Sequence, residues 1–183
     1  MKKVLGAAFW VFLYFVAYLA AECLGLFNPF CYLYFGLFAA ILCAWPYAKL
    51  TSRHPVPGMA IMSVALVIAL YTIAGEVKDF KFLFVWGGLL LGLVSEIIRY
   101  LVTDKQKAIV LSYLPLSLIP FTSTWFMWAS PTHMYAETAE EMGTSYADAM
   151  QPLFNGWLEA GMIVVTLTLA YFCVRFFTKK PSV

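Results

Sequence analysis

The sequence predicts an all-α integral membrane protein: a compact bundle of six transmembrane helices in one domain, residues 1–183. Composition is the first reason, because 63% of the 183 residues are apolar and 12% are charged, whereas soluble globular proteins contain about 45–50% apolar and about 25% charged residues. The aromatic content of 18% excludes a disordered chain, since such chains lack the apolar surface that offsets ordering entropy. The third reason is the presence of uncharged stretches long enough to cross a hydrocarbon core about 30 Å thick.

Six predominantly apolar stretches have the length of about 20 residues that a membrane-spanning helix needs. They are predicted near residues 4–26, 30–50, 57–75, 82–101, 108–128 and 156–178. The first follows Lys2 and Lys3, but it is longer than the apolar region of a signal peptide, about 7–15 residues, so we expect it to remain as a helix. Asn28-Pro29 separates the first two stretches, because Asn followed by Pro favours a turn.

Basic residues fall almost entirely on one side of the predicted bundle. Of the 12 Lys and Arg residues, only Lys78 and Lys81 lie in connections on the side opposite the two termini. Cytoplasmic connections are enriched in Lys and Arg, so both termini are predicted to be cytoplasmic. The opposite, external side carries most of the loop carboxylates. The net charge of +2 is too small to indicate a nucleic-acid partner.

Small residues four positions apart occur in five of the six predicted helices. Such pairs let helix backbones approach closely in lipid, although they also arise by chance in Gly/Ala-rich helices. The pairs are Ala17/Ala21, Gly36/Ala40, Ala65/Ala69, Gly88/Gly92 and Gly156/Ala160. Together they favour a compact bundle.

The longest connection, residues 129–155, is predicted to be an external lid loop, because loops of this length without a role are uncommon. Between Tyr135 and Met150, apolar residues recur mostly at three- and four-residue spacing, interrupted by Gly143-Thr144-Ser145. This spacing predicts one or two short amphipathic helices over the external face. Two interpretations remain open: a lid that gates access, or an interfacial helix without a gating function.

No motif of a catalytic or nucleotide-binding site is found in the sequence, so an enzyme is disfavoured. The two histidines, His54 and His133, are expected on opposite sides of the membrane, which leaves no obvious acid–base pair. The four cysteines have no CxxC spacing, so neither a metal cluster nor a bound cofactor is predicted. Cys23 and Cys31 lie near one membrane face and can pair if that face is oxidising; otherwise they act as small apolar residues.

Three carboxylates fall inside the predicted spans or at their ends, where a charge usually faces a partner or a water-filled cavity. Glu96 has Arg99 three residues on, so the two are neighbours on a helix, and this pair is predicted to be structural or a subunit contact. Glu22 and Glu159 lie at external ends of two spans. They either reach interfacial water or line an outward-facing cavity.

Aromatic and polar residues gather at the same external level. An aromatic belt at the membrane interface explains them, and so does a ligand pocket with apolar walls and a few polar groups. The candidate substrate-binding residues are Glu22, Glu159, Tyr18, Asn28, Tyr71, Trp125, Trp128, His133, Tyr135 and Trp157. His133 is also a possible haem ligand, since His, Met and Tyr side chains serve as axial ligands of haem iron.

This pattern resembles the substrate-binding membrane subunits, or S components, of energy-coupling factor (ECF) transporters, in particular the Trep_Strep or MptD-like group. The resemblance covers nearly the whole chain. It is carried by six short spans with both termini inside, and by Leu13-Tyr14-Phe15-Val16, Gly58-Met59-Ala60-Ile61-Met62, Tyr146-Ala147-Asp148-Ala149 and the basic end from Arg175 to Lys180.

The resemblance implies a multi-pass protein of the bacterial plasma membrane that captures a scarce micronutrient, such as a vitamin, haem or another metal chelate. It implies docking on a membrane coupling subunit with two cytoplasmic ATPases, and rotation in the bilayer to release the substrate. Small residues of the first helix are the candidate docking residues: Gly6, Ala7, Ala8, Ala17 and Ala21. Two other functions remain open: a self-contained small-solute channel or carrier, and a membrane enzyme or assembly factor.

Overall fold

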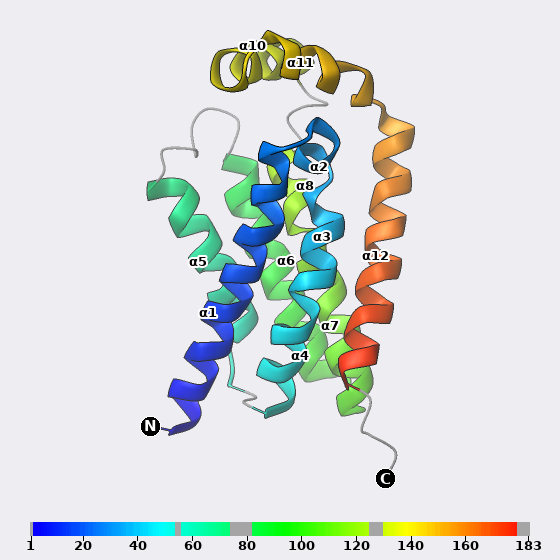
Figure 1. Ribbon diagram of the computed structural model, residues 1–183. Helices are drawn as coiled ribbons and strands as arrows, with labels where there is room; N and C mark the ends of the chain where they lie inside the picture. The colour runs from blue at the N-terminus through cyan, green and yellow to red at the C-terminus, as the bar shows by residue number, and fades with distance from the viewer. Residues whose placement is uncertain (1, 54–55, 74–81, 125–129, 179–183) are drawn as a thin grey trace.

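The computed structural model describes residues 2–53, 56–73, 82–124 and 130–178, and all regular structure within these ranges is helical. Long helices run roughly along the long axis of the molecule (Figure 1). They are α1 (Lys2–Cys23), α5 (Met59–Ile73), α6 (Phe82–Leu101) and α12 (Gly156–Thr178). Helices α6 and α12 have the bounds predicted for the fourth and sixth stretches. The first stretch is α1 followed by the 3-10 helix η1 (Leu24–Leu26).

Among the described residues, four helical segments are long and apolar enough to cross a membrane. They are Val4–Leu26, Phe35–Arg53, Phe84–Leu101 and Gly156–Thr178. Helix α5 is apolar but shorter. These segments support a multi-pass membrane protein. The start of α1 and the end of α12 lie at the same end of the molecule (Figure 1), whereas six crossings and the cytoplasmic side of that end stay predictions.

The prediction of one continuous helix over residues 30–50 is wrong. The structure divides this stretch into α2 (Pro29–Leu33), α3 (Phe35–Leu42) and α4 (Ala44–Arg53). The predicted turn before it is present, since the Asn28 side chain accepts a hydrogen bond of 2.8 Å from the Phe30 N–H and Pro29 occupies the first helical position. The interruption at Cys43 has a direct cause: Pro46 has no N–H to donate to the Leu42 carbonyl.

The predicted fifth helix, residues 108–128, also needs correction. The structure has α7 (Lys105–Ser117) and α8 (Ile119–Thr124), separated at Leu118. The helix begins earlier than predicted because the Asp104 carboxylate accepts a 2.9 Å hydrogen bond from the Lys107 N–H and caps it. Pro115 and Pro120 remove two backbone donors around the interruption. Residues 125–129 lie outside the described residues.

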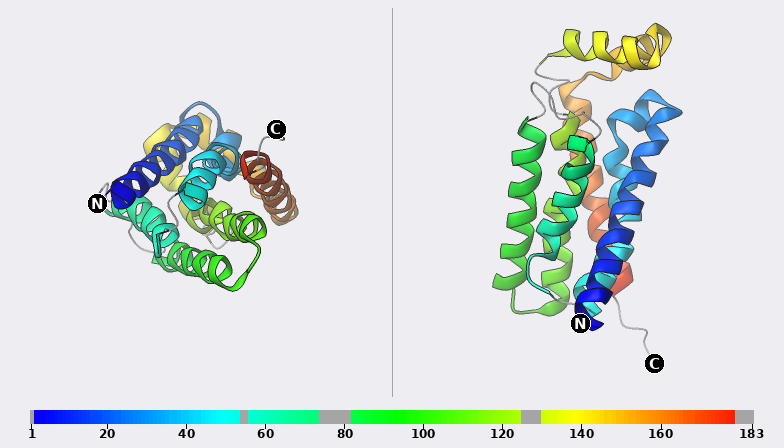
Figure 2. Two further views of the ribbon diagram at one scale, coloured as in Figure 1. Left: turned by 90° about the horizontal axis from the view of Figure 1, so that it is seen from below. Right: turned by 90° about the vertical axis from the view of Figure 1, so that its left-hand side faces the viewer.

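The long connection folds as predicted into short helices. They are α10 (Pro131–Met142), α11 (Thr144–Met150) and the 3-10 helix η3 (Gln151–Leu153). Gly143 separates α10 from α11 with a positive φ of 91°, which favours glycine. These helices, which we call the lid segment, lie across one end of the bundle, nearly perpendicular to its long axis (Figures 1 and 2). We call that end the lid end and the opposite one the basic end.

Helix α4 lies inside the bundle: viewed along the long axis, α1, α5, α6, α7 and α12 surround it (Figure 2). In the candidate span Phe35–Arg53, 61% of the apolar stretch is buried inside the molecule. The corresponding share in the other three candidate spans is 17–28%. The outer helices therefore present apolar faces, as membrane helices do in lipid. On α1, Leu5, Phe9 and Phe12 are each more than half exposed.

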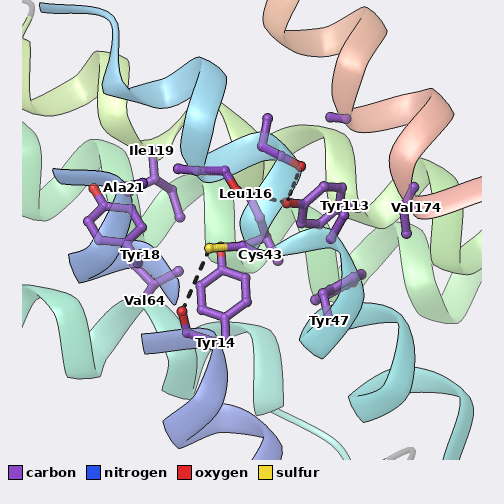
Figure 3. Close-up of a cluster of buried hydrophobic side chains, with 14 of the residues drawn as sticks. Tyr14, Tyr18, Ala21, Cys43, Tyr47, Val64, Tyr113, Leu116, Ile119 and Val174 are labelled. Carbon is purple, nitrogen blue, oxygen red and sulfur yellow. Dashed lines mark hydrogen bonds between the residues drawn. The ribbon is translucent and has the colours of Figure 1, made fainter. Parts of the chain in front are cut away.

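The core is unusually rich in tyrosine. Tyr14, Tyr18, Tyr47 and Tyr113 are all buried and belong to one cluster between the long helices (Figure 3). Buried hydroxyls need partners, and Tyr113 donates to the Ala40 carbonyl oxygen over 2.8 Å. The central helices are thus joined by polar as well as apolar contacts.

Close packing at small residues is confirmed for some of the predicted pairs. A Cβ added at Gly92 would lie 3.2 Å from Val64 Cγ2, and one added at Gly36 would lie 3.0 Å from Phe121 Cε2. The prediction is wrong for Gly156/Ala160, where both residues are exposed and a Cβ on Gly156 meets no atom within 4 Å. Among the described residues, that pair is on a helix face exposed to the outside of the bundle.

Candidate functional site

Glu22 and Tyr71 meet at the lid end of the bundle. The Tyr71 hydroxyl, in the last turn of α5, donates a hydrogen bond to Oε1 of Glu22, in the last turn of α1. Both side chains are half-buried. The Tyr71 ring also packs on Phe84 of α6, with ring centroids 4.9 Å apart. Three helices therefore position one carboxylate near the mouth of the bundle.

Tyr18 lies one turn below Glu22 on the same helix. Its ring is 1% exposed and meets Phe35 edge to face, with ring centroids 5.6 Å apart, and Val64 and Ile119 lie beside it (Figure 3). Among the described residues its buried hydroxyl has no hydrogen-bond partner. A buried hydroxyl without a partner costs about 1–3 kcal/mol. The Glu22–Tyr71 pair and the Tyr18 hydroxyl form what we call the Glu22 cluster.

Two tyrosines join the lid segment to the bundle. The Tyr146 hydroxyl on α11 donates to the Gly25 carbonyl oxygen in η1, and the Tyr34 hydroxyl donates to the Leu153 carbonyl oxygen in η3 over 3.1 Å. The Tyr146 ring also meets Tyr32 edge to face, with ring centroids 6.4 Å apart. Partial burial raises the pKa of Tyr146 to about 12, so the hydroxyl is a proton donor at neutral pH.

The underside of the lid segment packs on a second apolar cluster. Met134 of α10 and Met150 of α11 are fully buried there with Tyr34 and Phe121. Between the two lid helices, the Tyr135 hydroxyl donates a 2.6 Å hydrogen bond to Asp148 Oδ1, and this bond raises the pKa of Tyr135. The lid segment is therefore a folded unit with its own internal and external contacts.

The structure separates Glu159 from Glu22. Glu159 lies in the first turn of α12, which stands on the opposite side of α2 and α3 from α1 (Figures 1 and 2). Its charge acts on Tyr34, not on Tyr71. The two predicted acidic residues thus belong to different parts of the lid end. The prediction of a hollow beside both of them stays a prediction.

Other predicted substrate-binding residues have different surroundings. Asn28 is exposed and caps α2, and Trp157 is 89% exposed on α12, as an interfacial belt residue would be. His133 is exposed, whereas Met134 beside it is buried. His133 and Met134 therefore face different ways, which gives the haem hypothesis no support. Trp125 and Trp128 lie outside the described residues.

A small cavity lies within the lid segment. It has a volume of about 340 Å³ and is lined by Pro131, Thr132, Tyr135, Gln151 and Phe154. Ligand pockets usually occupy about 300–1,000 Å³, so this cavity suits a small group at most. Of the predicted binding residues, Tyr135 contributes to it.

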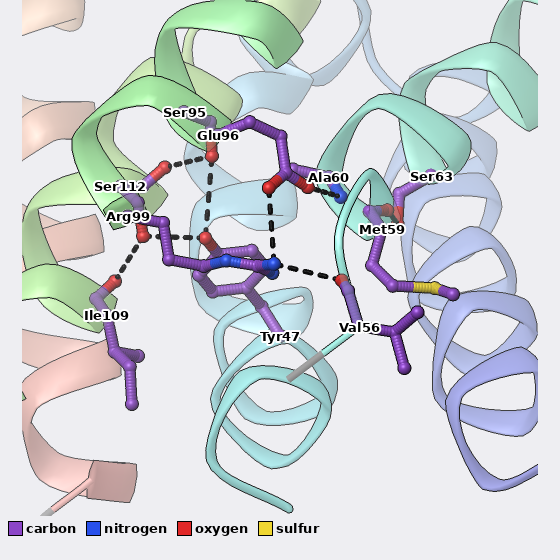
Figure 4. A network of polar contacts seen from close by, with 10 residues as sticks. All are labelled: Tyr47, Val56, Met59, Ala60, Ser63, Ser95, Glu96, Arg99, Ile109 and Ser112. Carbon is purple, nitrogen blue, oxygen red and sulfur yellow. Dashed lines mark hydrogen bonds and ion pairs between the residues drawn. The ribbon is translucent and has the colours of Figure 1, made fainter. Parts of the chain in front are cut away.

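At the basic end, Glu96 and Arg99 form the predicted ion pair, with Glu96 Oε2 and Arg99 Nη2 3.2 Å apart and both side chains largely buried (Figure 4). Glu96 Oε1 accepts a 2.8 Å hydrogen bond from the Ala60 N–H, and Arg99 Nη2 donates to the Val56 carbonyl oxygen over 2.9 Å. The carboxylate lies at the N-terminus of α5, where the helix dipole favours negative charge. The pair therefore holds the connection between α4 and α5 against α6.

A neighbouring group of hydroxyls was not predicted. The Tyr47 hydroxyl of α4 lies 2.7 Å from Ser112 Oγ of α7, and Ser95 Oγ of α6 donates to the Ser112 carbonyl oxygen over 2.6 Å (Figure 4). Hydropathy counts Tyr47 as apolar, so a hydropathy profile does not mark this group of hydroxyls. The only available signal was serine at positions that helix periodicity assigns to the interior.

The candidate docking residues on α1 are distributed between interior and surface. Ala7 and Ala21 are fully buried within this chain, Ala7 against Val11 and Leu50 and Ala21 in the main core. Gly6 and Ala17 are half-buried, and Ala8 is exposed. Cys23 and Cys31 are both free, so they form no disulfide in this structure.

Comparison with known proteins finds one family. The model of the family Trep_Strep, described as a hypothetical bacterial integral membrane protein, matches residues 1–179. No curated protein and no solved structure matches the chain.

Proposed function

Since the chain belongs to the Trep_Strep family of bacterial integral membrane proteins, we propose that it is the substrate-capture subunit of an ECF-type importer in the bacterial plasma membrane. In this proposal the lid end faces outward and binds a scarce micronutrient. The chain crosses the membrane six times, and the basic end faces the cytoplasm. A membrane coupling subunit and two cytoplasmic ATPases supply the energy, because the sequence contains no nucleotide-binding motif.

The Glu22 cluster is the observation that carries this proposal. A carboxylate placed at the end of apolar helices is expensive and usually marks a substrate or ion pathway. Glu22 is held there by Tyr71, and the Tyr18 hydroxyl below it lacks a partner among the described residues. A ligand with an N–H or O–H donor, or a positive charge, would pair with Glu22. Its aromatic or apolar part would lie against the surrounding rings.

The lid segment gives this site a means of closure. Side-chain hydrogen bonds from Tyr146 and from Tyr34 join it to the helices beneath. We infer that the lid segment moves away to admit substrate and returns to cover it. Loops that close over a substrate exclude water and so strengthen polar contacts within the site.

Docking on the coupling subunit is assigned to the exposed face of α1. This face contains Ala8, and beside it Leu5, Phe9 and Phe12 are more than half exposed, whereas Gly6 is half-buried outside this face. Small residues allow close approach of a partner helix, and large apolar residues bury area against it.

Affinity purification of the tagged chain from its native host, in mild detergent, tests this function. We expect a membrane coupling protein and two ATPases in stoichiometric amounts, and loss of all three when Ala8 is replaced by Trp. Mass spectrometry of small molecules released from the same sample would identify the substrate. Purification without any partner, together with solute transport by vesicles holding this chain alone, would contradict the proposal and support a self-contained carrier.

A further inference from the structure

A cavity of about 620 Å³ lies at the basic end, at the bundle end opposite the Glu22 cluster. It is formed where α4 and α6 end, α7 begins and α12 ends. Arg99 and Lys105 supply positive charge, and Thr51 and Ser52 supply hydroxyls. The volume lies within the usual range of ligand sites.

The Arg99 guanidinium is only partly used by the protein. Its Nη2 atom contacts Glu96 and the Val56 carbonyl oxygen. Its Nη1 atom is buried and has no hydrogen-bond partner among the described residues, and the side chain as a whole is 9% exposed. A buried charged donor without an acceptor is costly. Arg99 also lines the cavity, so an acceptor that enters there pairs with this guanidinium once the side chain turns toward the cavity.

Lys105 adds a second positive charge to the lining of the cavity. Its side chain is exposed at the mouth of the cavity, at the start of α7, and it takes part in no ion pair within the described ranges. The Glu96 carboxylate balances the charge of Arg99, and its other oxygen accepts the hydrogen bond from the Ala60 N–H. The cavity thus has an excess of positive charge, and this excess favours an anion.

The remaining walls of the cavity are mostly apolar, with Gln106 and Thr178 as further polar residues. Tyr100, Val102 and Ile109 line it, and Tyr100 is 60% exposed on the outer surface of α6. A basic recess bordered by an outward apolar face fits a charged headgroup with an attached acyl chain. Basic pockets between transmembrane helices on the cytoplasmic side are known to bind anionic lipid headgroups.

We propose that this cavity binds a phosphate group, supplied by an anionic phospholipid of the adjacent leaflet or by free phosphate. The phosphate oxygens accept hydrogen bonds from the Arg99 guanidinium, which turns toward the cavity, and form an ion pair with the Lys105 ammonium group. With a phospholipid, the glycerol and acyl chains leave along Tyr100 and Ile109. Arg is well suited to this role because its N–H groups match phosphate oxygens geometrically. This site is separate from substrate capture and does not depend on it.

Binding is measured on delipidated protein in detergent by native mass spectrometry, in parallel titrations with phosphatidylglycerol and phosphatidylcholine. In a third titration, inorganic phosphate is followed by phosphorus NMR line broadening. We expect Lys105→Gln to weaken phosphatidylglycerol binding about fivefold, the factor that corresponds to about 1 kcal/mol per basic residue. Ser52→Trp places an indole in the cavity, whose lining includes Ser52, and should abolish binding. Arg53→Gln is the control: it also removes one positive charge, but Arg53 follows Ser52 in the chain and does not line the cavity. This variant should leave phosphatidylglycerol binding unchanged.

Each outcome decides the proposal. Preference for phosphatidylglycerol that Lys105→Gln weakens, Ser52→Trp removes and Arg53→Gln leaves unchanged supports a lipid source. Broadening of the phosphate signal that Ser52→Trp removes, without preference for phosphatidylglycerol, supports free phosphate. Equal affinity for both lipids with no phosphate broadening overturns the proposal, as does an equal effect of Arg53→Gln and Lys105→Gln, which would indicate general surface charge.

Discussion

The hydroxyl of Tyr71 donates a hydrogen bond to the carboxylate of Glu22, a residue 49 positions earlier in the chain. This bond joins the ends of α5 and α1 at the lid end. It also fixes the orientation of one oxygen of the carboxylate to which we assign ligand binding. Substitutions at Glu22 or Tyr71 therefore test whether this contact serves ligand binding or only the folding of the lid end.

Glu22→Gln should reduce the small-molecule ligand that co-purifies with the protein. The amide keeps the shape and still accepts a hydrogen bond from Tyr71, but it removes the charge. Hydrogen bonds to charged groups are worth about 1.5–3 kcal/mol, so we expect affinity to fall roughly 10- to 100-fold. The ligand is quantified by mass spectrometry of the denatured sample. Trp157→Ala, at an exposed position on α12, is the control, and equal ligand loss in both variants would remove Glu22 from the site.

Tyr146→Phe should loosen the lid segment. The substitution removes the hydrogen bond to the Gly25 carbonyl oxygen and keeps the ring against Tyr32. A neutral hydrogen bond contributes about 0.5–1.5 kcal/mol, so we expect amide hydrogen exchange in α11 to accelerate by roughly 3- to 10-fold.

Tyr135→Phe is the matched control for the lid segment, because its hydroxyl bonds to Asp148 within the segment. It should change exchange in α10 and α11 without changing exchange in η1. Unchanged exchange in both η1 and α11 of Tyr146→Phe would show that the lid segment is held by its apolar underside alone.

Alkaline pH should release the same contact. The pKa of Tyr146 is raised to about 12 in the folded protein, whereas an unperturbed tyrosine has a pKa of about 10. The folded state therefore binds the proton more tightly, and its advantage is constant below about pH 10 and is lost as the pH rises toward 12. Ultraviolet difference titration of wild type against Tyr146→Phe isolates this phenol. A midpoint near 10 would show that the Tyr146 hydroxyl is not buried against η1.

Helix placement could be predicted from the sequence because it depends on apolar length, and lipid imposes that length. The bounds of α6 and α12 follow from charged and small residues at their ends. The divisions at Cys43 and Leu118 were missed although Pro46, Pro115 and Pro120 signal them, because a hydropathy window averages over a proline. Residues near Tyr34 depart from helical geometry without a nearby proline, and only tertiary contacts account for this.

The candidate site was predictable as a set of residues but not as contacts. Glu22, Tyr18 and Tyr71 were all expected at one membrane level, since depth follows from position along each helix. Which of these side chains face one another depends on the rotation of each helix about its own axis and on which helices pack side by side. The separation of Glu159 from Glu22 and the exposure of Trp157 follow from those two variables, which hydropathy does not report.

Removing one partner of the Glu96–Arg99 pair should destabilise the protein strongly. In Glu96→Ala, the Arg99 charge remains buried at the basic end, and breaking a buried pair in this way costs about 3–5 kcal/mol. Thermal unfolding in detergent measures the loss. The double variant Glu96→Met with Arg99→Met removes both charges and should recover most of the stability. A double variant as unstable as Glu96→Ala would assign the effect to the lost hydrogen bonds at Ala60 and Val56.

Gly25→Ala should weaken the same end of the molecule that Tyr146 holds. A Cβ at Gly25 would lie 2.9 Å from the Tyr32 Cα atom, and a backbone atom cannot move aside as a flexible side chain can. The turn between η1 and α2 must then shift, which displaces the carbonyl that accepts from Tyr146. We expect faster exchange in α11 and a lower melting temperature. Gly161→Ala is the control, since a Cβ there meets no atom within 4 Å and alanine within a helix is favoured over glycine by about 1 kcal/mol. The two alanine variants should therefore shift the melting temperature in opposite directions, and a loss of stability in Gly161→Ala equal to that in Gly25→Ala would refute the close approach of η1 to α2 as the cause.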